Sequence, residues 1–169
     1  MIYNITLLAL NKSFQQKIAK KLAKKLGMFF VDVNDLIKYE LEDIKKVISI
    51  AGIEYYNKVE HKIVKSVCGY ENAVISINID TLNKDSNIEK IKQSSLVIFL
   101  KTSFNYLKQK LTTKQKDKYE NEINISVFEE RNKILSSISN IIIDIDELSE
   151  KKVLDLIVNE LIKFYENRG

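Results

Sequence analysis

The chain has 169 residues, 45% hydrophobic and 30% charged, which suits one globular domain with a sizeable core. The net charge of +4 is mild and the charges are interspersed, so we do not expect a nucleic-acid interface. The first apolar run is too short for a bilayer span or a signal peptide, and Cys68 is the single cysteine, so we expect a protein of the reducing cytoplasm.

Residues 4–35 read as a strand, a short loop, a helix and a second strand. Residues 2–9 are apolar on both faces, which is typical of a central parallel strand. The sequence S-F-Q-Q then predicts a capping box in which Ser13 caps a helix and Gln16 reaches back to it. Gly27 is suited to end this helix, and residues 28–33 predict the next strand. This unit is typical of the opening of a parallel α/β nucleotide-binding domain.

The same alternation continues to the end of the chain. Short helical pieces are expected within 35–50, and a longer helix between Gly52 and Gly69. The later apolar patterns predict strands at 73–78, 95–101 and 140–145, and helices at 87–93, 104–111, 127–138 and 149–166. The alternation predicts one three-layer α/β/α domain, residues 1–169, around a five-stranded parallel sheet. Ligands of such folds bind beyond the carboxyl ends of the strands.

The order of these elements resembles the shikimate kinases, small P-loop kinases of the nucleoside monophosphate kinase fold. The resemblance covers residues 3–165. It rests on KIAKKLAKKLGMFFVDVNDLI (17–37), GIEYYNKVE (52–60), AVISI (73–77), LVIFLKTS (96–103), FEERNKIL (128–135) and NIIIDID (140–146). It implies a substrate-domain helical insertion at 35–68 and a lid at 112–125. It also implies transfer of the ATP γ-phosphate to shikimate, with ATP and magnesium as cofactors.

The residues found here do not match the phosphate-binding loop of that family. An ungapped reading sets GxxxxGK[ST] against ALNKSFQQ (9–16), so Phe14 takes the place of the second glycine and Gln15 that of the lysine. Phosphate binding needs those glycines for backbone N–H groups that curl round the ligand, and the lysine for charge. A gapped reading sets Lys12 and Ser13 on the Lys-Ser pair but shortens the loop by three residues. We interpret the stretch as a tight capped turn without an intact Walker A motif.

Weak anion binding remains open at this turn. A helix N-terminus offers unpaired backbone N–H groups and a positive dipole end. The phosphate-loop candidates for such binding are Asn11, Lys12 and Ser13.

Two positions after the second strand correspond to catalytic residues of the family. By the resemblance, Asp32 takes the place of an aspartate that holds magnesium through water, and Asn34 that of an aspartate that contacts the substrate hydroxyl. An amide cannot act as a base at neutral pH. Magnesium is usually held jointly with phosphates, so Asp32 alone is a poor metal site. We therefore expect both residues to be vestiges of a catalytic site.

The substrate-binding positions also depart from the family pattern. Asn57 stands where the family has an arginine for the substrate carboxylate, and Asn78-Ile79-Asp80 replaces its triple glycine. Arg131 matches a second carboxylate-binding arginine; it either binds one carboxylate or pairs with Glu129 or Glu130. The lid segment 112–124 has lysines, Lys114, Lys116 and Lys118, but no arginine to close over a transferred phosphate.

These departures lead to three hypotheses. The first is a shikimate-kinase-like protein that is inactive or severely impaired, needs no cofactor, and has a binding or regulatory role linked to aromatic amino-acid biosynthesis. Its ligand would be a protein of the shikimate pathway or a small carboxylate. The alternative is a divergent but active shikimate kinase that uses Lys12, Asp32 and Arg131 with ATP and magnesium. The third is a module without a small ligand, which an exposed apolar patch within 35–60 would favour.

Overall fold

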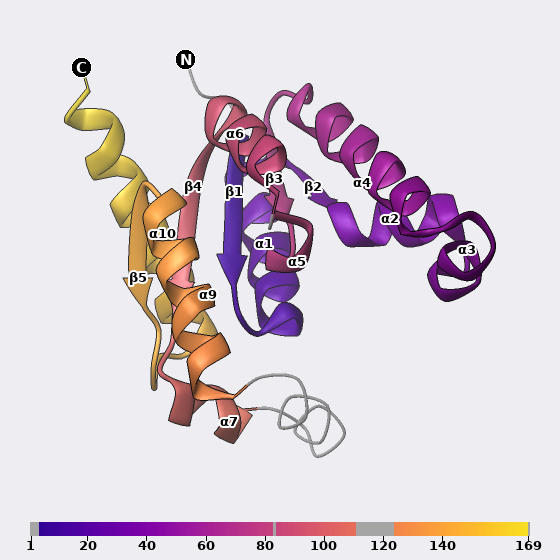
Figure 1. Ribbon diagram of the computed structural model, residues 1–169. Helices are drawn as coiled ribbons and strands as arrows, with labels where there is room; N and C mark the ends of the chain where they lie inside the picture. Colours follow the sequence, from indigo (N-terminus) through magenta and orange to yellow (C-terminus); the bar gives the residue numbers. More distant parts are fainter. Residues whose placement is uncertain (1–3, 83, 111–123, 169) are drawn as a thin grey trace.

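The computed structural model describes residues 4–82, 84–110 and 124–168 (Figure 1). Five parallel strands form one sheet in the order β2-β3-β1-β4-β5. The strands are β1 (Asn4–Ala9), β2 (Phe29–Asp32), β3 (Ala73–Ser76), β4 (Ser95–Lys101) and β5 (Ile141–Asp144). The predicted five-stranded parallel sheet is thereby confirmed, with β1 at its centre.

Helices cover both faces of the sheet (Figure 1). They are α1 (Lys12–Leu26), α2 (Val33–Leu41), α3 (Ile44–Ala51), α4 (Ile53–Cys68), α5 (Ile79–Leu82), α6 (Asp85–Ser94), α7 (Phe104–Lys110), α9 (Ile125–Ile138) and α10 (Glu150–Glu166). Helices α1 and α10 pack on one face, while α6 and α9 pack on the other. The three-layer arrangement is therefore as predicted, and α2, α3 and α4 lie to one side of the sheet, beyond the β2 edge.

Strand β1 is buried on both faces because helices lie on each side of it. Ile5 and Leu7 belong to the core that α1 and α10 complete, and Leu8 belongs to the core on the opposite face. The polar side chain of Thr6 is also buried, and its hydroxyl lies 2.7 Å from the hydroxyl of Ser95 on β4. Burial on both faces explains why this strand shows no polar alternation in sequence.

The predicted boundaries need small corrections. Each of β2, β3 and β5 is shorter than predicted, and the single turn α5 was not predicted. Gly27 ends α1 as expected, in a left-handed conformation with φ of 66°. Most of the predicted lid, residues 112–123 with Lys114, Lys116 and Lys118, lies outside the described residues. None of the helices in the described ranges is long and apolar enough to cross a membrane.

Candidate functional site

Only two residues, Leu10 and Asn11, join β1 to α1. The side-chain Oδ1 of Asn11 accepts a hydrogen bond from the backbone N–H of Phe14 at 3.1 Å, and its carbonyl accepts from the N–H of Gln15 at 2.9 Å. The prediction that Ser13 caps this helix is therefore wrong. Asn11 has an extended backbone two residues earlier, and asparagine is as good an N-cap as serine.

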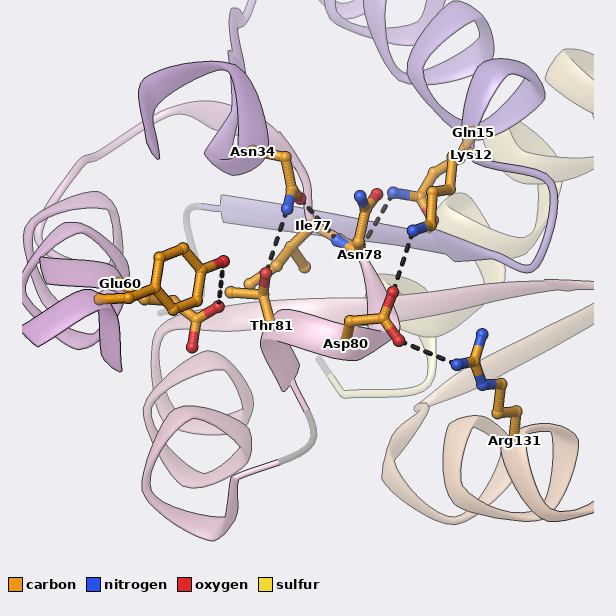
Figure 2. Close-up of polar contacts among 10 residues, drawn as sticks. Lys12, Gln15, Asn34, Glu60, Ile77, Asn78, Asp80, Thr81 and Arg131 are labelled. Carbon is orange, nitrogen blue, oxygen red and sulfur yellow. Dashed lines mark hydrogen bonds and ion pairs between the residues drawn. The ribbon is translucent and has the colours of Figure 1, made fainter. Parts of the chain in front are cut away.

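Gln15 lies in the first turn of α1 and is 1% exposed. Its Oε1 accepts from the backbone N–H of Ala9 at 2.6 Å. Its Nε2 donates to the hydroxyl of Ser76 at 3.0 Å. It also donates to the carbonyl of Ile77 at 3.0 Å (Figure 2). One amide therefore ties the start of α1 to the carboxyl ends of both β1 and β3. A buried polar group of this kind is stable only when it is hydrogen-bonded, and both of its donors are used here.

Asp32 ends β2 and caps α2. Its Oδ1 accepts from the backbone N–H of Asp35 at 2.9 Å, so a negative charge sits at the positive end of the helix. Gln16, predicted to complete a capping box with Ser13, donates instead to the Asp35 carboxylate at 2.7 Å. The contacts of Asp32 thus give it a structural function, while its role as a magnesium ligand stays a prediction.

Asn34 uses both ends of its amide to hold the segment that follows β3. Its Oδ1 accepts from the backbone N–H of Asn78 at 3.0 Å, and its Nδ2 donates to the hydroxyl of Thr81 at 3.1 Å (Figure 2). The asparagine therefore fixes α5 against α2. These two contacts position Asn78 and Thr81, the residues on either side of Ile79 and Asp80.

Asp80 projects from α5 between two cations (Figure 2). Its Oδ2 lies 2.9 Å from Lys12 Nζ at the start of α1, and its Oδ1 lies 2.9 Å from a guanidinium nitrogen of Arg131 on α9. Among the described residues, this carboxylate is the partner of Arg131, and the predicted alternatives Glu129 and Glu130 are not. The structure thus brings together two predicted site residues, Lys12 and Arg131, through a third residue.

A second charge cluster surrounds Glu60 on α4. Glu60 is 2% exposed and forms an ion pair with Lys84, whose ammonium also donates to Asn57 Oδ1 at 2.7 Å. The hydroxyl of Tyr56 donates to the other Glu60 oxygen at 3.1 Å. Burial, followed by the charge of Glu60, raises the pKa of Tyr56 to about 12. Lys84 therefore lies beside Asn57, which the resemblance predicts to stand at the position of a substrate-binding arginine, but its ammonium is paired with Glu60.

The one histidine and the one cysteine of the chain are in ordinary structural environments. His61 Nδ1 lies 2.9 Å from Asn87 Oδ1. Cys68 is half-buried, and burial raises the pKa of its thiol, which fits a structural and not a nucleophilic residue. Over the ranges that the structure describes, no three His, Cys, Asp or Glu residues gather in a group that could hold a metal ion.

A cavity of about 510 Å³ opens beside the first turn of α1. Its walls come from α1, the ends of β4 and β5, α7 and the start of α10, and include Phe14, Lys17, Leu100, Tyr106, Ile145 and Glu150. The volume suits a small organic ligand. Gln15 and Asp80 are not among the described residues that line this cavity. The cluster of Lys12, Asp80 and Arg131 is therefore separate from the cavity, on the other side of the α1 N-terminus.

Sequence reasoning missed two residues that organise the site. Gln15 precedes Ile18 and Leu22 on the buried face of α1, and a polar residue on such a face signals a hydrogen-bonding role. Lys84 was harder to recognise. A buried carboxylate such as Glu60 needs a cation as its partner, but the sequence does not show which lysine or arginine that partner is.

Comparison with known proteins adds a family match. The sequence model of the family described as "Shikimate kinase" matches residues 15–162. A shikimate kinase from Sulfurihydrogenibium sp. is 27% identical over 162 residues, 94% of this chain and 97% of its own length. One from Persephonella marina is 32% identical over 100 residues, 59% of this chain and 61% of that protein. The match to a shikimate kinase from Chloroherpeton thalassium, at 25% identity, likewise spans 66% of this chain and only 60% of the relative.

Solved structures share the fold. A shikimate kinase from Acinetobacter baumannii in complex with shikimate superposes with a TM-score of 0.79 at 15% identity, covering 96% of this chain and 94% of that one. A shikimate kinase from Aquifex aeolicus gives 0.75 at 21% identity, covering 96% and 98%. At these identities the similarity establishes a common architecture.

Proposed function

This chain belongs to the shikimate kinase family, and we propose that within the family it is a binding or regulatory protein without efficient kinase activity. The buried, hydrogen-bonded environment of Gln15 is the observation that supports this proposal most directly. In the ungapped reading it occupies the position of the lysine that would contact the nucleotide phosphates. Here that position holds an uncharged side chain, buried and hydrogen-bonded to Ala9, Ser76 and Ile77.

The residues present do not fit an ATP–magnesium complex bound as in a P-loop kinase. Such a loop presents backbone N–H groups to the phosphates. Here the N–H of Ala9 is bonded to Gln15, and the N–H of Phe14 is bonded to Asn11. The carboxylate of Asp32, the magnesium candidate, caps α2. These contacts support the interpretation of residues 9–16 as a degenerate Walker A motif.

The substrate side of the site supports the same proposal. Asn34 cannot remove a proton from a substrate hydroxyl, and its amide is used to hold Asn78 and Thr81. Arg131, the candidate for a substrate carboxylate, already contacts the carboxylate of Asp80. The lysine beside Asn57 is likewise paired within the protein.

A cytoplasmic protein of the aromatic amino-acid pathway is the partner we propose for the binding role. Helices α2 to α4 expose large apolar side chains: Tyr39 is 85% exposed, Ile50 76%, Ile53 53% and Tyr55 49%. Exposed apolar groups of this size are common at protein–protein contacts. They lie in the region where an exposed apolar patch would favour the interaction-module hypothesis, so the proposed protein contact does not depend on a small ligand.

The alternative proposal is a divergent, active shikimate kinase. It is favoured by the relatives, which are named as shikimate kinases, and by the 510 Å³ cavity beside α1. In that case Lys12, Asp32 and Arg131 would have to act in a rearranged site, with ATP and magnesium as cofactors.

A coupled ADP-release assay with shikimate, ATP and magnesium distinguishes the two proposals. We expect no turnover above the level of a Lys12→Ala, Arg131→Ala double variant, which is the matched control for contaminating host kinases. Turnover near or above roughly 1 per second, an ordinary enzyme rate, would establish the alternative. Growth of a strain that lacks its own shikimate kinases, when it carries this chain, would do the same.

A further inference from the structure

We propose that Lys12 and Arg131 form an anion site whose occupant is the chain's own Asp80 carboxylate, so that Asp80 keeps small external carboxylates out. This inference rests on the contacts of three side chains and not on the proposed function. It concerns equilibrium binding without nucleotide, and it holds whether or not the chain turns over shikimate.

The two cations come from separate elements and divide one carboxylate between them. Lys12 at the start of α1 contacts Oδ2 of Asp80, and Arg131 on α9 contacts Oδ1, each at 2.9 Å. Figure 2 shows Asp80 lying between these two side chains. Two donors on opposite oxygens are the arrangement expected around a bound carboxylate, and charge-assisted bonds are the stronger class of hydrogen bond.

The backbone holds Asp80 in place. Its neighbours Ile79 and Thr81 are buried, and the Thr81 hydroxyl accepts a hydrogen bond from Asn34. The Thr81 carbonyl also accepts from Asn87 at 2.9 Å. The carboxylate is therefore attached to a fixed turn and not to a loose loop.

A tethered group competes at a high effective concentration. Even short flexible links give effective concentrations in the millimolar range, and Asp80 is held more rigidly than that. A small free anion must therefore displace a permanent competitor. If the charge of Asp80 is removed, Lys12 and Arg131 still face the space between them without a carboxylate. A free anion can reach this space from solvent, because the side chain of Asp80 is 53% exposed.

The test replaces Asp80 with asparagine, which keeps its shape, and titrates malonate followed by amide chemical shifts. We expect the Asp80→Asn variant to bind malonate at least about tenfold more tightly than the unaltered chain. The double variant Asp80→Asn, Arg131→Gln should lose most of this gain. Thermal unfolding of each variant within a few degrees of the unaltered chain will show that the fold is retained, as expected for exposed pairs.

The matched control is Asp155→Asn, which makes the same change in net charge but removes a carboxylate that faces a single lysine, Lys25, at 3.4 Å. If Asp80→Asn binds malonate no more tightly than Asp155→Asn, the proposal is wrong. It is equally wrong if the gain survives in the Arg131→Gln background, because the anion would then bind elsewhere.

Discussion

Replacing Gln15 by alanine tests the arrangement at the α1 N-terminus. The substitution removes a side chain that is 1% exposed and deletes its bonds to Ala9, Ser76 and Ile77. The N–H of Ala9 would be left buried without this partner, which typically costs about 1–3 kcal/mol, and loss of the bond to the Ile77 carbonyl adds about 0.5–1.5 kcal/mol. Because the Ser76 hydroxyl, which accepts from Gln15 Nε2, can turn to another partner, we expect a total loss of about 2–4 kcal/mol.

The loss of unfolding free energy is measured by urea unfolding, and the change in melting temperature by heating, both followed by circular dichroism. At about 2–4 °C per kcal/mol for a chain of this size, the melting temperature should fall by roughly 5–15 °C. The control is Gln16→Ala on the next residue, whose bond to Asp35 is exposed, and which should cost less than about 0.5 kcal/mol. Equal effects of the two substitutions would refute the argument that Gln15 joins the two strands.

A lysine at this position sharpens the same prediction. Gln15→Lys restores the residue type of the phosphate-binding motif but buries a charge whose neighbours are the Ala9 N–H, the Ser76 hydroxyl and the Ile77 carbonyl. We expect it to be destabilised at least as much as the alanine variant and to gain no affinity for ATP–magnesium. Recovery of micromolar ATP binding by this single change would show that only the lysine was missing.

Three further predictions concern other parts of the site. Asp32→Ala should cost about 1 kcal/mol of unfolding free energy through loss of the α2 cap, while Asp32→Asn, which can cap equally well, should cost little; a large loss in the asparagine variant would show that the charge has another function. Lys84→Met leaves Glu60 buried without its cation and should lower the free energy of unfolding by about 1–3 kcal/mol; an unchanged urea unfolding midpoint would contradict this. Because the pKa of Tyr56 is raised to about 12, its hydroxyl favours folding only while protonated, so stability should fall between about pH 10 and pH 12, and Tyr56→Phe should flatten that fall in alkaline unfolding curves.

The sequence was a good guide to the fold because apolar patterning is a local signal. The alternation of apolar strands such as β1 and β4 with amphipathic helices such as α1 predicted a parallel sheet with helices on both faces. Strand ends were harder to predict. At Asp32, for example, β2 ends and the side chain of the same residue caps α2.

The site was harder to predict because its contacts join residues far apart in the chain. The capping box failed because Asn11 and Ser13 are both good caps, and only the backbone geometry selects between them. The bond between Asp80 and Arg131 spans 51 positions, and nothing local distinguishes it from a pair with Glu129 or Glu130. The sequence showed which residue types stand at the positions that resemble the family motifs, but not that the side chains of Gln15 and Asp80 are held by distant partners.

Isothermal titration with ATP–magnesium tests the central claim most directly, because the proposed function requires that no tight nucleotide site remains at the α1 N-terminus. We predict no saturable heat, corresponding to a Kd weaker than about 1 mM, or about −4 kcal/mol of binding free energy. A saturable isotherm with a Kd in the micromolar range would contradict the account and would favour the active kinase.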